Sequence, residues 1–417
     1  MRIVDVCAFY SPAGGGVRTY VDAKLRAAPQ LGHELIVIAP GQREEVVRVG
    51  PGAFIATIPS PRLPVDGRYR YFDDAWALHR ALDYWDPDHV ESSSPWSSAT
   101  MVGRWDGAAT RSLFMHSDPL AAYAYRWLGG IAPIQRIDRW FEWFWKHLRG
   151  LGMMFDAVIC GSGEYADRLS AGGVQNIETV RLGVESGIFS PALREPELRT
   201  AALEALGMER SGILLLGAGR FSAEKRWDLV IQAVGECARK LPVGLLLVGD
   251  GPKRHRLEIL AERYPTVGVL PRVQDRAEFA CFLASGDALI HGCESETFCL
   301  VATEARASGI PLIVPDRGAA VDQLVPCAGV TYQSGRERSL EQAIANFIER
   351  GPELQRAAAV RVSQVRSMNE HFADLFARYD ELVHVPARQS AAEGARVIES
   401  DVPPPTLAVA RSALRAR

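Results

Sequence analysis

The chain has 417 residues, which is enough for two or three domains that each bury a core of their own. Lys and Arg number 47 against 50 Asp and Glu, a formal net charge of −3. This balance argues against a nucleic-acid-binding protein, which usually carries a basic face. The seven cysteines include no Cys-x-x-Cys pair, so the composition predicts a reduced chain without a disulfide framework or a zinc site.

The first apolar stretch, residues 2–9, is short and contains Asp5, so we interpret it as a strand and not as a signal peptide. No apolar run approaches the roughly 18 residues of a transmembrane helix. We therefore expect a cytoplasmic protein, and peripheral contact with the inner face of the cytoplasmic membrane remains an open alternative.

Short apolar runs alternate with helix-length segments along the chain, the pattern of parallel sheets covered by helices. The first series of predicted strands comprises residues 2–9, 34–40, 54–59, 89–94, 111–116, 157–162 and 177–183. A second series comprises residues 212–219, 244–251, 267–271, 288–293 and 311–315. Between the two series, Glu185 to Leu203 contains two prolines and many charges without a sustained period, which predicts a linker.

The two series predict an α/β protein with two Rossmann-like domains, over residues 1–190 and 200–365. Apolar residues at helical spacing between Met368 and Leu382 predict a last helix over 366–385. Residues 386–417 are rich in Ala, Arg, Ser and Pro, and we predict that they form a disordered tail.

Ligands of open α/β sheets bind at the carboxyl ends of the strands, so the residues that follow each strand are the candidate site. Gly15 and Gly16 end a glycine run before the first predicted helix, where backbone amides can approach a phosphate; a flexible turn is the other interpretation. His116 stands at the end of the strand 111–116, where a side chain can reach a ligand, whereas a histidine inside a strand would belong to the core.

The second series carries more charge at its strand ends. Arg220 and Lys225 lie where a helix begins, and two cations there complement a diphosphate, although a solvated basic turn has the same composition. Glu296 and Glu304 are eight positions apart. If a helix starts near Cys299, both carboxylates can face hydroxyl-rich groups, while the amides of residues 298–301 face an anion. Two exposed glutamates near a helix start are the alternative.

Together these segments resemble family 4 of the retaining GT-B glycosyltransferases, also called glycosyl transferases group 1. That family carries G-R-x-x-x-E-K, V-G-x-G-P and E-x(7)-E within E-G-F-G-x-x-x-x-E-A. This sequence has Gly219–Lys225, then Val248–Pro252, then Glu296–Glu304, in the same order. The amino-terminal half agrees more loosely, through its glycine run and His116. The resemblance covers the chain to about residue 385.

The resemblance implies a GT-B fold, in which two Rossmann-like domains face each other across a cleft and the last helix, 366–385, returns to the first domain. It implies that Arg220 and Lys225 neutralise the donor diphosphate, that Glu296 holds the hydroxyls of the transferred sugar, and that His116 bonds the sugar or polarises the reacting centre. These four would be the catalytic residues. The donor-binding positions that it implies are Gly15, Gly16, Gly249, Arg272, Val273, Phe298, Cys299, Leu300 and Glu304, with Glu304 on the ribose.

The sequence departs from E-G-F-G at two places, where Thr297 and Cys299 replace glycines. Neither change removes a charge. We expect Thr297 to narrow the space beside the sugar if its side chain points inward, and Cys299 to influence which donor is used.

The resemblance implies retaining transfer of a hexose from a nucleotide diphosphate sugar, GDP-mannose first and a UDP-sugar next, to a lipid or glycan acceptor. No metal or other cofactor is expected, because cations and helix amides stabilise the departing diphosphate. Asp86-Pro87-Asp88 matches an Asp-x-Asp metal motif but precedes its strand, so we interpret it as a turn. The alternatives are a GT-B fold epimerase and a non-catalytic sugar-nucleotide-binding protein.

Residues 123–145 hold many aromatics interleaved with basic side chains. Such a mixture suits a membrane interface, and a core helix explains part of it equally well. Peripheral membrane contact through the amino-terminal domain is therefore an expectation, with lipid and glycan acceptors both open. The aromatic residues are Tyr123, Tyr125, Trp127, Trp140, Phe141, Trp143, Phe144 and Trp145.

Overall fold

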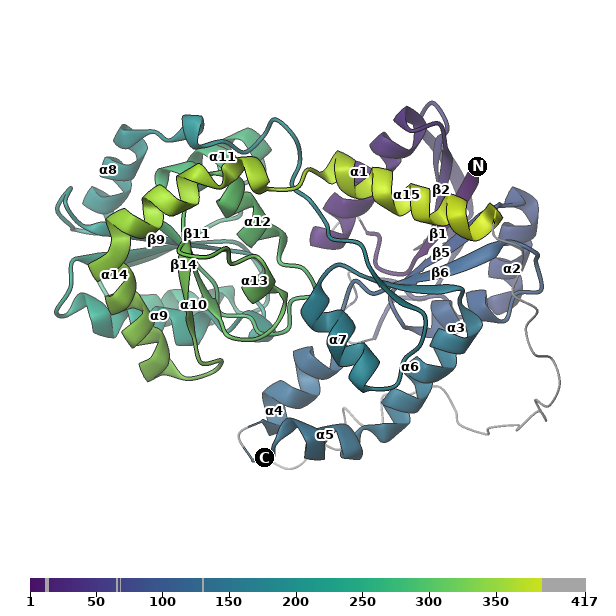
Figure 1. Ribbon diagram of the computed structural model, residues 1–417, viewed down its shortest axis with the longest axis horizontal. Coiled ribbons are helices and arrows are strands. Elements are labelled where there is room, and N and C mark those ends of the chain that lie inside the picture. Colours follow the sequence, from purple (N-terminus) through teal and green to yellow (C-terminus); the bar gives the residue numbers. More distant parts are fainter. Residues whose placement is uncertain (12–14, 65–66, 68, 130, 385–417) are drawn as a thin grey trace.

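The computed structural model describes residues 1–384 except 12–14, 65–66, 68 and 130 (Figure 1). The predicted tail, 386–417, lies outside the described residues. Two sheets lie side by side, and each is flanked by helices (Figure 1). This arrangement is the predicted α/β class with two Rossmann-like units.

The first sheet has eight strands in the order β3-β4-β2-β1-β5-β6-β7-β8. All of its pairs are parallel except β3 with β4, which is antiparallel. The bounds are β1 (Arg2–Cys7), β2 (Glu34–Gly41), β3 (Glu45–Gly50), β4 (Ala53–Pro59), β5 (His89–Ser93), β6 (Thr110–Phe114), β7 (Ala157–Cys160) and β8 (Ile177–Thr179).

The second sheet has six parallel strands in the order β11-β10-β9-β12-β13-β14. The bounds are β9 (Ile213–Ala218), β10 (Val243–Val248), β11 (Val267–Leu270), β12 (Ala288–Ile290), β13 (Leu312–Pro315) and β14 (Gly329–Tyr332). In both sheets the order reverses beside the first strand of the unit, the switch point at which α/β sheets bind ligands.

The helices of the first half are α1 (Gly16–Gln30), α2 (Ala75–Trp85), α3 (Ser97–Gly103), the π-helical η1 (Leu120–Tyr125), α4 (Arg126–Leu128), α5 (Ile134–Trp140), α6 (Glu142–Met154) and α7 (Gly163–Ala171). Those that follow are α8 (Pro196–Ala205), α9 (Trp227–Ala238), α10 (Arg254–Ala261), α11 (Arg276–Ser285), α12 (Leu300–Ala307), α13 (Ala319–Asp322), α14 (Glu337–Val360) and α15 (Met368–His384). Three short 3-10 turns are η2 (Pro191–Leu193), η3 (Ala223–Lys225) and η4 (Val362–Gln364).

Helices cover both faces of each sheet. Because successive side chains of a strand point to opposite faces, neighbouring residues of one strand join different core clusters. In β9, Leu215 joins the cluster that contains side chains of α9, α10 and α14, while Leu214 and Leu216 join the cluster formed by α8, α11 and α12. The second half therefore has two distinct cleft-side corners, one beside α9 and α10 and the other beside α11 and α12.

The structure differs from the predicted elements in two ways. The segment Glu185–Leu203, predicted to be a linker, contains the start of α8, which is anchored to the second half because the Arg199 guanidinium donates to both carboxylate oxygens of Asp287 at 3.1 Å or less. Strands β3 and β14 were not predicted. They lie at sheet edges, and β3 is largely exposed, so its sequence lacks the apolar run of a buried strand.

The last helix returns to the first half, as the resemblance implies. Helix α15 covers Met368–His384 of the predicted 366–385 and packs with α1 in one apolar cluster. The chain crosses between the halves twice, near Val184 and again near Ser367. The two crossing segments run side by side, because Val184 and Ser367 form a parallel bridge. No helix among the described residues is both long enough and apolar enough to span a bilayer.

Candidate active site

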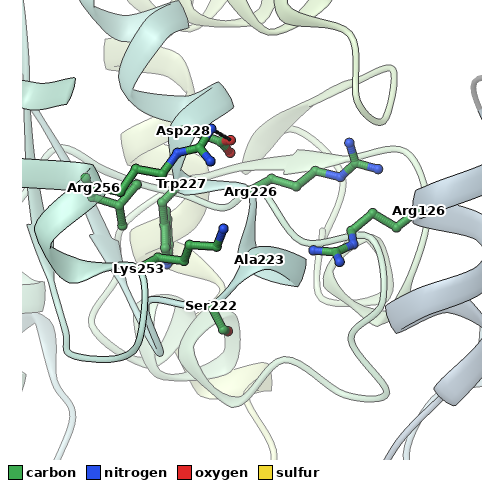
Figure 2. Close-up of a pocket in the computed structure, with 9 residues that line it drawn as sticks. Arg126, Ser222, Ala223, Arg226, Trp227, Asp228, Lys253 and Arg256 are labelled. Carbon is green, nitrogen blue, oxygen red and sulfur yellow. Dashed lines mark ion pairs between the residues drawn. The ribbon is translucent and has the colours of Figure 1, made fainter. Parts of the chain in front are cut away.

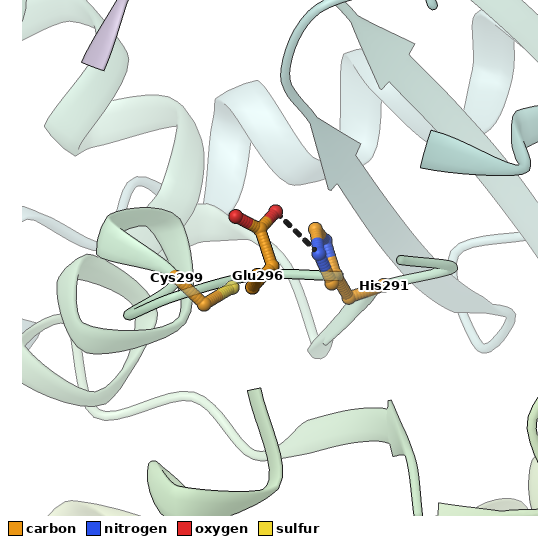
Figure 3. A group of neighbouring side chains, drawn as sticks. All are labelled: His291, Glu296 and Cys299. Carbon is orange, nitrogen blue, oxygen red and sulfur yellow. Dashed lines mark hydrogen bonds and ion pairs between the residues drawn. The ribbon is translucent and has the colours of Figure 1, made fainter. Parts of the chain in front are cut away.

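Lys225, Glu296 and His291 form a charged cluster at the carboxyl end of β12. The ammonium of Lys225 contacts Glu296 Oε1, and the same oxygen lies 2.9 Å from His291 Nε2 (Figure 3). His291 follows β12 directly and is 1% exposed, whereas the side chains of Lys225 and Glu296 are 19% and 17% exposed. Glu296 Oε1 is thus held from two sides at a partly open surface.

In this cluster the effect of burial on each pKa is opposed by the charge of the partner group. Burial alone would raise the pKa of Glu296, but the Lys225 charge and the His291 hydrogen bond outweigh burial and hold this pKa well below its usual range. Burial alone would lower the pKa of Lys225, but the Glu296 carboxylate reverses the shift and raises it. Both groups are therefore charged across the physiological pH range, as a site for polar ligands requires.

Cys299 brings a sulfur atom close to the same cluster. Ligand atoms of His291, Glu296 and Cys299 all lie within 4.8 Å of one another, which is compact enough for a metal ion (Figure 3). The Lys225 ammonium already contacts Glu296 Oε1, and a second cation there would be repelled. We therefore interpret the three residues as a hydrogen-bonding group.

Cys299 has a φ of 68°, in the left-handed region that favours glycine, and it precedes the first turn of α12. This is the fourth position of E-G-F-G, where the family has glycine, so the backbone keeps the glycine conformation with a larger side chain. Thr297, the other departure, donates its hydroxyl to the carbonyl of His116 at 2.9 Å. Its hydroxyl therefore ties the two halves together.

Arg220 is held from both halves of the protein. Its Nη2 donates to the Tyr69 hydroxyl at 2.8 Å, and its carbonyl accepts from Trp227 Nε1 at 3.0 Å. A Cβ placed on Gly15 would lie 3.9 Å from Arg220 Nη2, and one placed on Gly16 would lie 3.7 Å from Leu300. Gly15 and Gly16 therefore approach Arg220 and the start of α12 from across the cleft.

His116 lies directly after Met115 at the carboxyl end of the first sheet, as predicted. Its ring stacks on Phe114 and meets the edge of Tyr20, with centroid distances of 4.4 Å and 4.9 Å. Burial lowers its pKa to about 4, against an opposing effect from Asp5. Nε2 is buried and has no hydrogen-bond partner among the described residues. A neutral imidazole with one free ring nitrogen is suited to bonding a hydroxyl group.

Glu304 lies inside α12 and is 6% exposed. Arg276 Nη2 donates to Glu304 Oε1 at 2.7 Å, and Arg276 Nε lies 3.6 Å from Glu185. Burial raises the pKa of Glu304, and the Arg276 charge opposes this effect without cancelling it. Glu304 and Arg276 thus occupy the corner beside α11 and α12.

The remaining predicted positions line the same edge. Arg272 is exposed and Val273 half-buried on the loop between β11 and α11. A Cβ on Gly249 would come within 2.0 Å of the Gly219 carbonyl, so only glycine fits there. Leu300 begins α12, and Phe298 is buried in an apolar cluster together with side chains of the first half.

Asp86 and Asp88 precede β5 and lie at the amino ends of the strands, opposite to this edge. Asp86 ends α2, and the Asp88 carboxylate accepts from the backbone amide of Arg2 at 2.6 Å, at the amino end of β1. The structure thus agrees with their interpretation as a turn.

Sequence reasoning missed His291, Tyr69 and Arg276. His291 was within reach, because it follows a strand of the second series as Arg220 does. Tyr69 and Arg276 carried no comparable signal, since one lies on an irregular loop and the other resembles an ordinary basic residue at a helix start.

The aromatic stretch divides between core and surface. Tyr125, Phe144 and Trp145 are buried, and Phe141 is half-buried. Four rings are more than half exposed on η1, α4, α5 and α6, and we call them, with Ile131, the aromatic surface; these rings are Tyr123, Trp127, Trp140 and Trp143.

Two family models match the chain, one for each half. "Glycosyltransferase Family 4" matches residues 14–187, and "Glycosyl transferases group 1" matches residues 201–361. The chain is 28% identical over 380 residues to a GDP-mannose-dependent alpha-(1-6)-phosphatidylinositol dimannoside mannosyltransferase of Mycobacterium tuberculosis, covering 90% of this chain and 95% of that protein. It is 29% identical over 354 residues to a GDP-mannose-dependent alpha-mannosyltransferase of the same species, covering 84% and 88%.

Solved structures show the same fold. A sucrose-phosphate synthase from Thermosynechococcus elongatus superposes with a TM-score of 0.73 at 18% identity, covering 92% of this chain and 99% of that one. A glycosyltransferase from Rickettsia africae gives a TM-score of 0.67 at 17% identity, with the same coverage. The chain therefore belongs to family 4 of the GT-B glycosyltransferases, enzymes that transfer a sugar from a nucleotide-sugar donor.

Proposed function

We propose that this enzyme transfers mannose from GDP-mannose to a lipid-linked or glycan acceptor, with retention of anomeric configuration and without a metal ion. The charged cluster of Lys225, Glu296 and His291 at the cleft edge carries the proposal, because it leaves Glu296 ionised beside a cation and partly open. The names of both mannosyltransferase relatives favour GDP-mannose over a UDP-sugar.

Each half supplies a part of the proposed donor site. Arg220 and Lys225 neutralise the diphosphate, and the amides at the start of α12 face it. Glu296 accepts hydrogen bonds from mannose hydroxyls, and Glu304 accepts them from the ribose. These groups all belong to the second half, and the first half contributes Gly15, which approaches Arg220 from the opposite side of the cleft.

The reaction proceeds by attack of the acceptor hydroxyl on the face from which the diphosphate leaves. The bond between the anomeric carbon and the phosphate oxygen breaks, the new glycosidic bond forms, and a donor phosphate oxygen takes the acceptor proton. Arg220 and Lys225 stabilise the charge that grows on the departing GDP, which is electrostatic preorganisation of the oxyanion-hole kind. His116, with its free Nε2, bonds a sugar hydroxyl near the reacting carbon.

The test measures mannose transfer from radiolabelled GDP-mannose to membrane lipids and to soluble glycans, with the chelator EDTA present. Retention predicts an α-linked product from the α-linked donor, which NMR of the purified product resolves. Arg220→Ala should lower turnover by about 10²-fold or more. Lys240→Ala, an exposed cation at the end of α9, is the matched control. Unchanged turnover in Arg220→Ala, or a β-linked product, contradicts the proposal.

We further propose that the aromatic surface contacts an anionic membrane, on the cytoplasmic face of the bilayer. Trp127, Trp140 and Trp143 are 61%, 52% and 52% exposed, and basic residues are interleaved with them in the sequence. Amphipathic rings at headgroup level together with Arg and Lys are the features of interfacial helices. A lipid-linked acceptor is consistent with this surface.

Co-sedimentation with vesicles of phosphatidylcholine and phosphatidylglycerol at low salt tests this contact. The triple variant Trp127→Ala, Trp140→Ala, Trp143→Ala should lose binding. Trp76→Ala is the control, because Trp76 on α2 is 67% exposed but lies outside the aromatic surface. No sedimentation of the wild type, or equal sedimentation of the triple variant, contradicts membrane contact.

The alternatives of an epimerase and a non-catalytic sugar-nucleotide-binding protein have less support. The relatives reported above are named as transferases. The partly exposed Glu296 carboxylate and the unpartnered Nε2 of His116 are groups that a transferred sugar could bond. Tight binding of GDP-mannose without transfer to any acceptor would favour the non-catalytic alternative.

A further inference from the structure

A second basic pocket lies between the two halves, beside the candidate donor site but lined by different residues. It has a volume of about 240 Å³ (Figure 2). Four of its lining residues are cations and one is an acid, and none of Arg220, Lys225, Glu296 or Glu304 is among them. The cations are Arg126, Arg226, Lys253 and Arg256, and the acid is Asp228.

The pocket occupies the corner beside α9 and α10. Arg226 immediately precedes α9, Lys253 immediately precedes α10, and Arg126 comes from α4 of the first half. Glu304, which we place at the ribose, and its ion-pair partner Arg276 belong to the opposite corner beside α11 and α12. The loop that carries Arg220 and Lys225 borders this pocket through Ser222 and Ala223, whereas neither Glu304 nor Arg276 lines it. The pocket is therefore distinct from the nucleoside end of the proposed donor site.

The pocket contains more cationic groups than neighbouring acidic groups can neutralise. Asp228 lies 4.0 Å from Arg256, and Glu294 pairs with Arg226. The guanidinium of Arg126 has no acidic partner among the described residues, and neither does the ammonium of Lys253. The Nε atoms of Arg126 and Arg226 are buried without a hydrogen-bond partner in the same part of the chain.

Figure 2 shows the guanidinium groups of Arg126 and Arg226 reaching toward one another from opposite halves. Like charges gathered in a partly enclosed space repel one another, and a bound anion turns this repulsion into attraction. Arg binds carboxylate and phosphate oxygens alike. A phosphoryl group offers three acceptor oxygens against the two of a carboxylate, so it can meet more of the cations that converge here from several directions. A pocket of this volume is smaller than the roughly 300 Å³ of a typical small-molecule site, so it fits one group of a larger ligand.

We propose that this pocket binds a phosphoryl group of the acceptor. The inference rests on the proposed transferase function and adds the chemical class of its acceptor. Arg126 also adjoins Trp127 of the aromatic surface, so a headgroup at a membrane can extend into the pocket. Closure of Arg126 onto Arg226 and Lys253 around the phosphoryl group would join the halves when the acceptor is present.

The test titrates the full chain with inorganic phosphate in a thermal melt, with GDP at saturation so that the donor diphosphate site is filled. Phosphate should raise the melting temperature further in the wild type. Arg126→Gln and Lys253→Gln, one in each half, should each weaken phosphate affinity at least tenfold, while Lys240→Gln should not change it. Absence of a phosphate shift above the GDP shift, or equal affinity in all variants, overturns the proposal.

The GDP shift itself separates the two proposals. An unchanged GDP shift in Arg126→Gln and Lys253→Gln shows that the variants fold and keep the donor site. If GDP gives no shift in the wild type, the proposed donor site fails, whereas phosphate binding to the pocket is still measured by its own shift.

Vesicles distinguish a lipid headgroup from a soluble phosphorylated acceptor. The probes are vesicles of phosphatidylcholine alone and of phosphatidylcholine mixed with phosphatidylinositol. If the wild type prefers vesicles that contain phosphatidylinositol and Lys253→Gln removes this preference, the result supports the pocket and assigns the bound phosphoryl group to a lipid. Phosphate binding that Lys253→Gln removes, with equal vesicle binding in both proteins, supports the pocket and assigns it to a soluble acceptor.

Discussion

Each half of the molecule contains a lysine that is paired with carboxylate groups, two in the first half and one in the second, and the two clusters differ in their exposure to solvent. In the first half, Lys24 Nζ donates to Asp5 at 3.1 Å and to Glu91 at 2.5 Å, and all three side chains are 0% exposed. Tyr379 of α15 donates to Glu91, and Ser93 donates to Asp5 at 3.0 Å. Every charge in this cluster has a protein partner.

In the second half, Lys225 and Glu296 make the same kind of pair, but it remains partly open at the cleft. The same ion-pair chemistry therefore serves two purposes. The closed cluster fastens α15 to the first sheet, whereas we propose that the open one keeps ionised groups accessible to a ligand. The comparison predicts that equivalent substitutions will affect stability in one half and turnover in the other.

Acidification should produce the largest loss of stability, and it should act on the first half, which contains the closed cluster. Burial lowers the pKa of His89 to about 3, of His116 to about 4 and of His371 to about 3. The unfolded chain protonates these groups near pH 6.5, so the folded state is fully favoured above that pH and loses stability as the pH falls toward 4. The three histidines together contribute up to about 4 kcal/mol per pH unit to the slope, and the raised pKa values of Asp5 and Glu304 oppose part of this contribution. Midpoints of urea unfolding measured between pH 4 and 7 test this loss of stability. A midpoint that does not change with pH would contradict the lowered pKa values of the three histidines.

Lys24→Met should have the second largest effect. We expect it to lower the free energy of unfolding by about 3–5 kcal/mol, because it leaves two buried carboxylates without their cation. Urea unfolding measures the loss. Lys240→Met, at an exposed site in the turn after α9, should change the stability by no more than about 0.5 kcal/mol. Wild-type stability in Lys24→Met would mean that the closed cluster does not hold the first half together.

Lys225→Met is the matched substitution in the open half. We expect turnover with GDP-mannose to fall by about 10²–10³-fold, since one stabilising cation of the leaving group is lost. The stability loss should be clearly smaller than for Lys24→Met, because water can reach Glu296. A variant that unfolds as readily as Lys24→Met while keeping its turnover would reverse the comparison.

His291→Phe should lower kcat/KM about tenfold or more, because Glu296 loses a hydrogen bond to its charged carboxylate. His291→Gln keeps a donor near the same position and should recover part of the loss. Steady-state kinetics of both variants provide the measurement. Equal kinetics for Phe and Gln would show that packing, and not the hydrogen bond, is what His291 contributes.

Tyr69→Phe should have the smallest effect, about fivefold in kcat/KM or roughly 1 kcal/mol, through the lost bond to Arg220 across the halves. Tyr84→Phe is the control, since Tyr84 is 78% exposed. Identical kinetics in both variants would remove Tyr69 from the positioning of Arg220.

The sequence predicted the residues whose signal is local. Arg220, Lys225 and Glu296 follow strands of a clear apolar series, so their place at one edge was within reach of pattern reasoning. Tyr69 bonds Arg220 of the other half, and Arg126 lines a pocket together with residues of the other half, and no spacing along the chain encodes such proximity. The start of α8 was interpreted as linker because its charges mask a short apolar stripe, and only Leu203 of that helix is buried. The assigned roles of the site residues stay predictions until the variants are measured.

The most direct test is a thermal melt of the full chain with GDP-mannose, UDP-glucose and ADP-glucose, in wild type, Arg220→Ala and Lys24→Met. A donor at a hundredfold excess over its dissociation constant adds about 2.7 kcal/mol of stability. The open-cluster account predicts a GDP-mannose shift that Arg220→Ala abolishes and that Lys24→Met retains on a lower baseline. A shift that survives in Arg220→Ala, or none with GDP-mannose in the wild type, would contradict it.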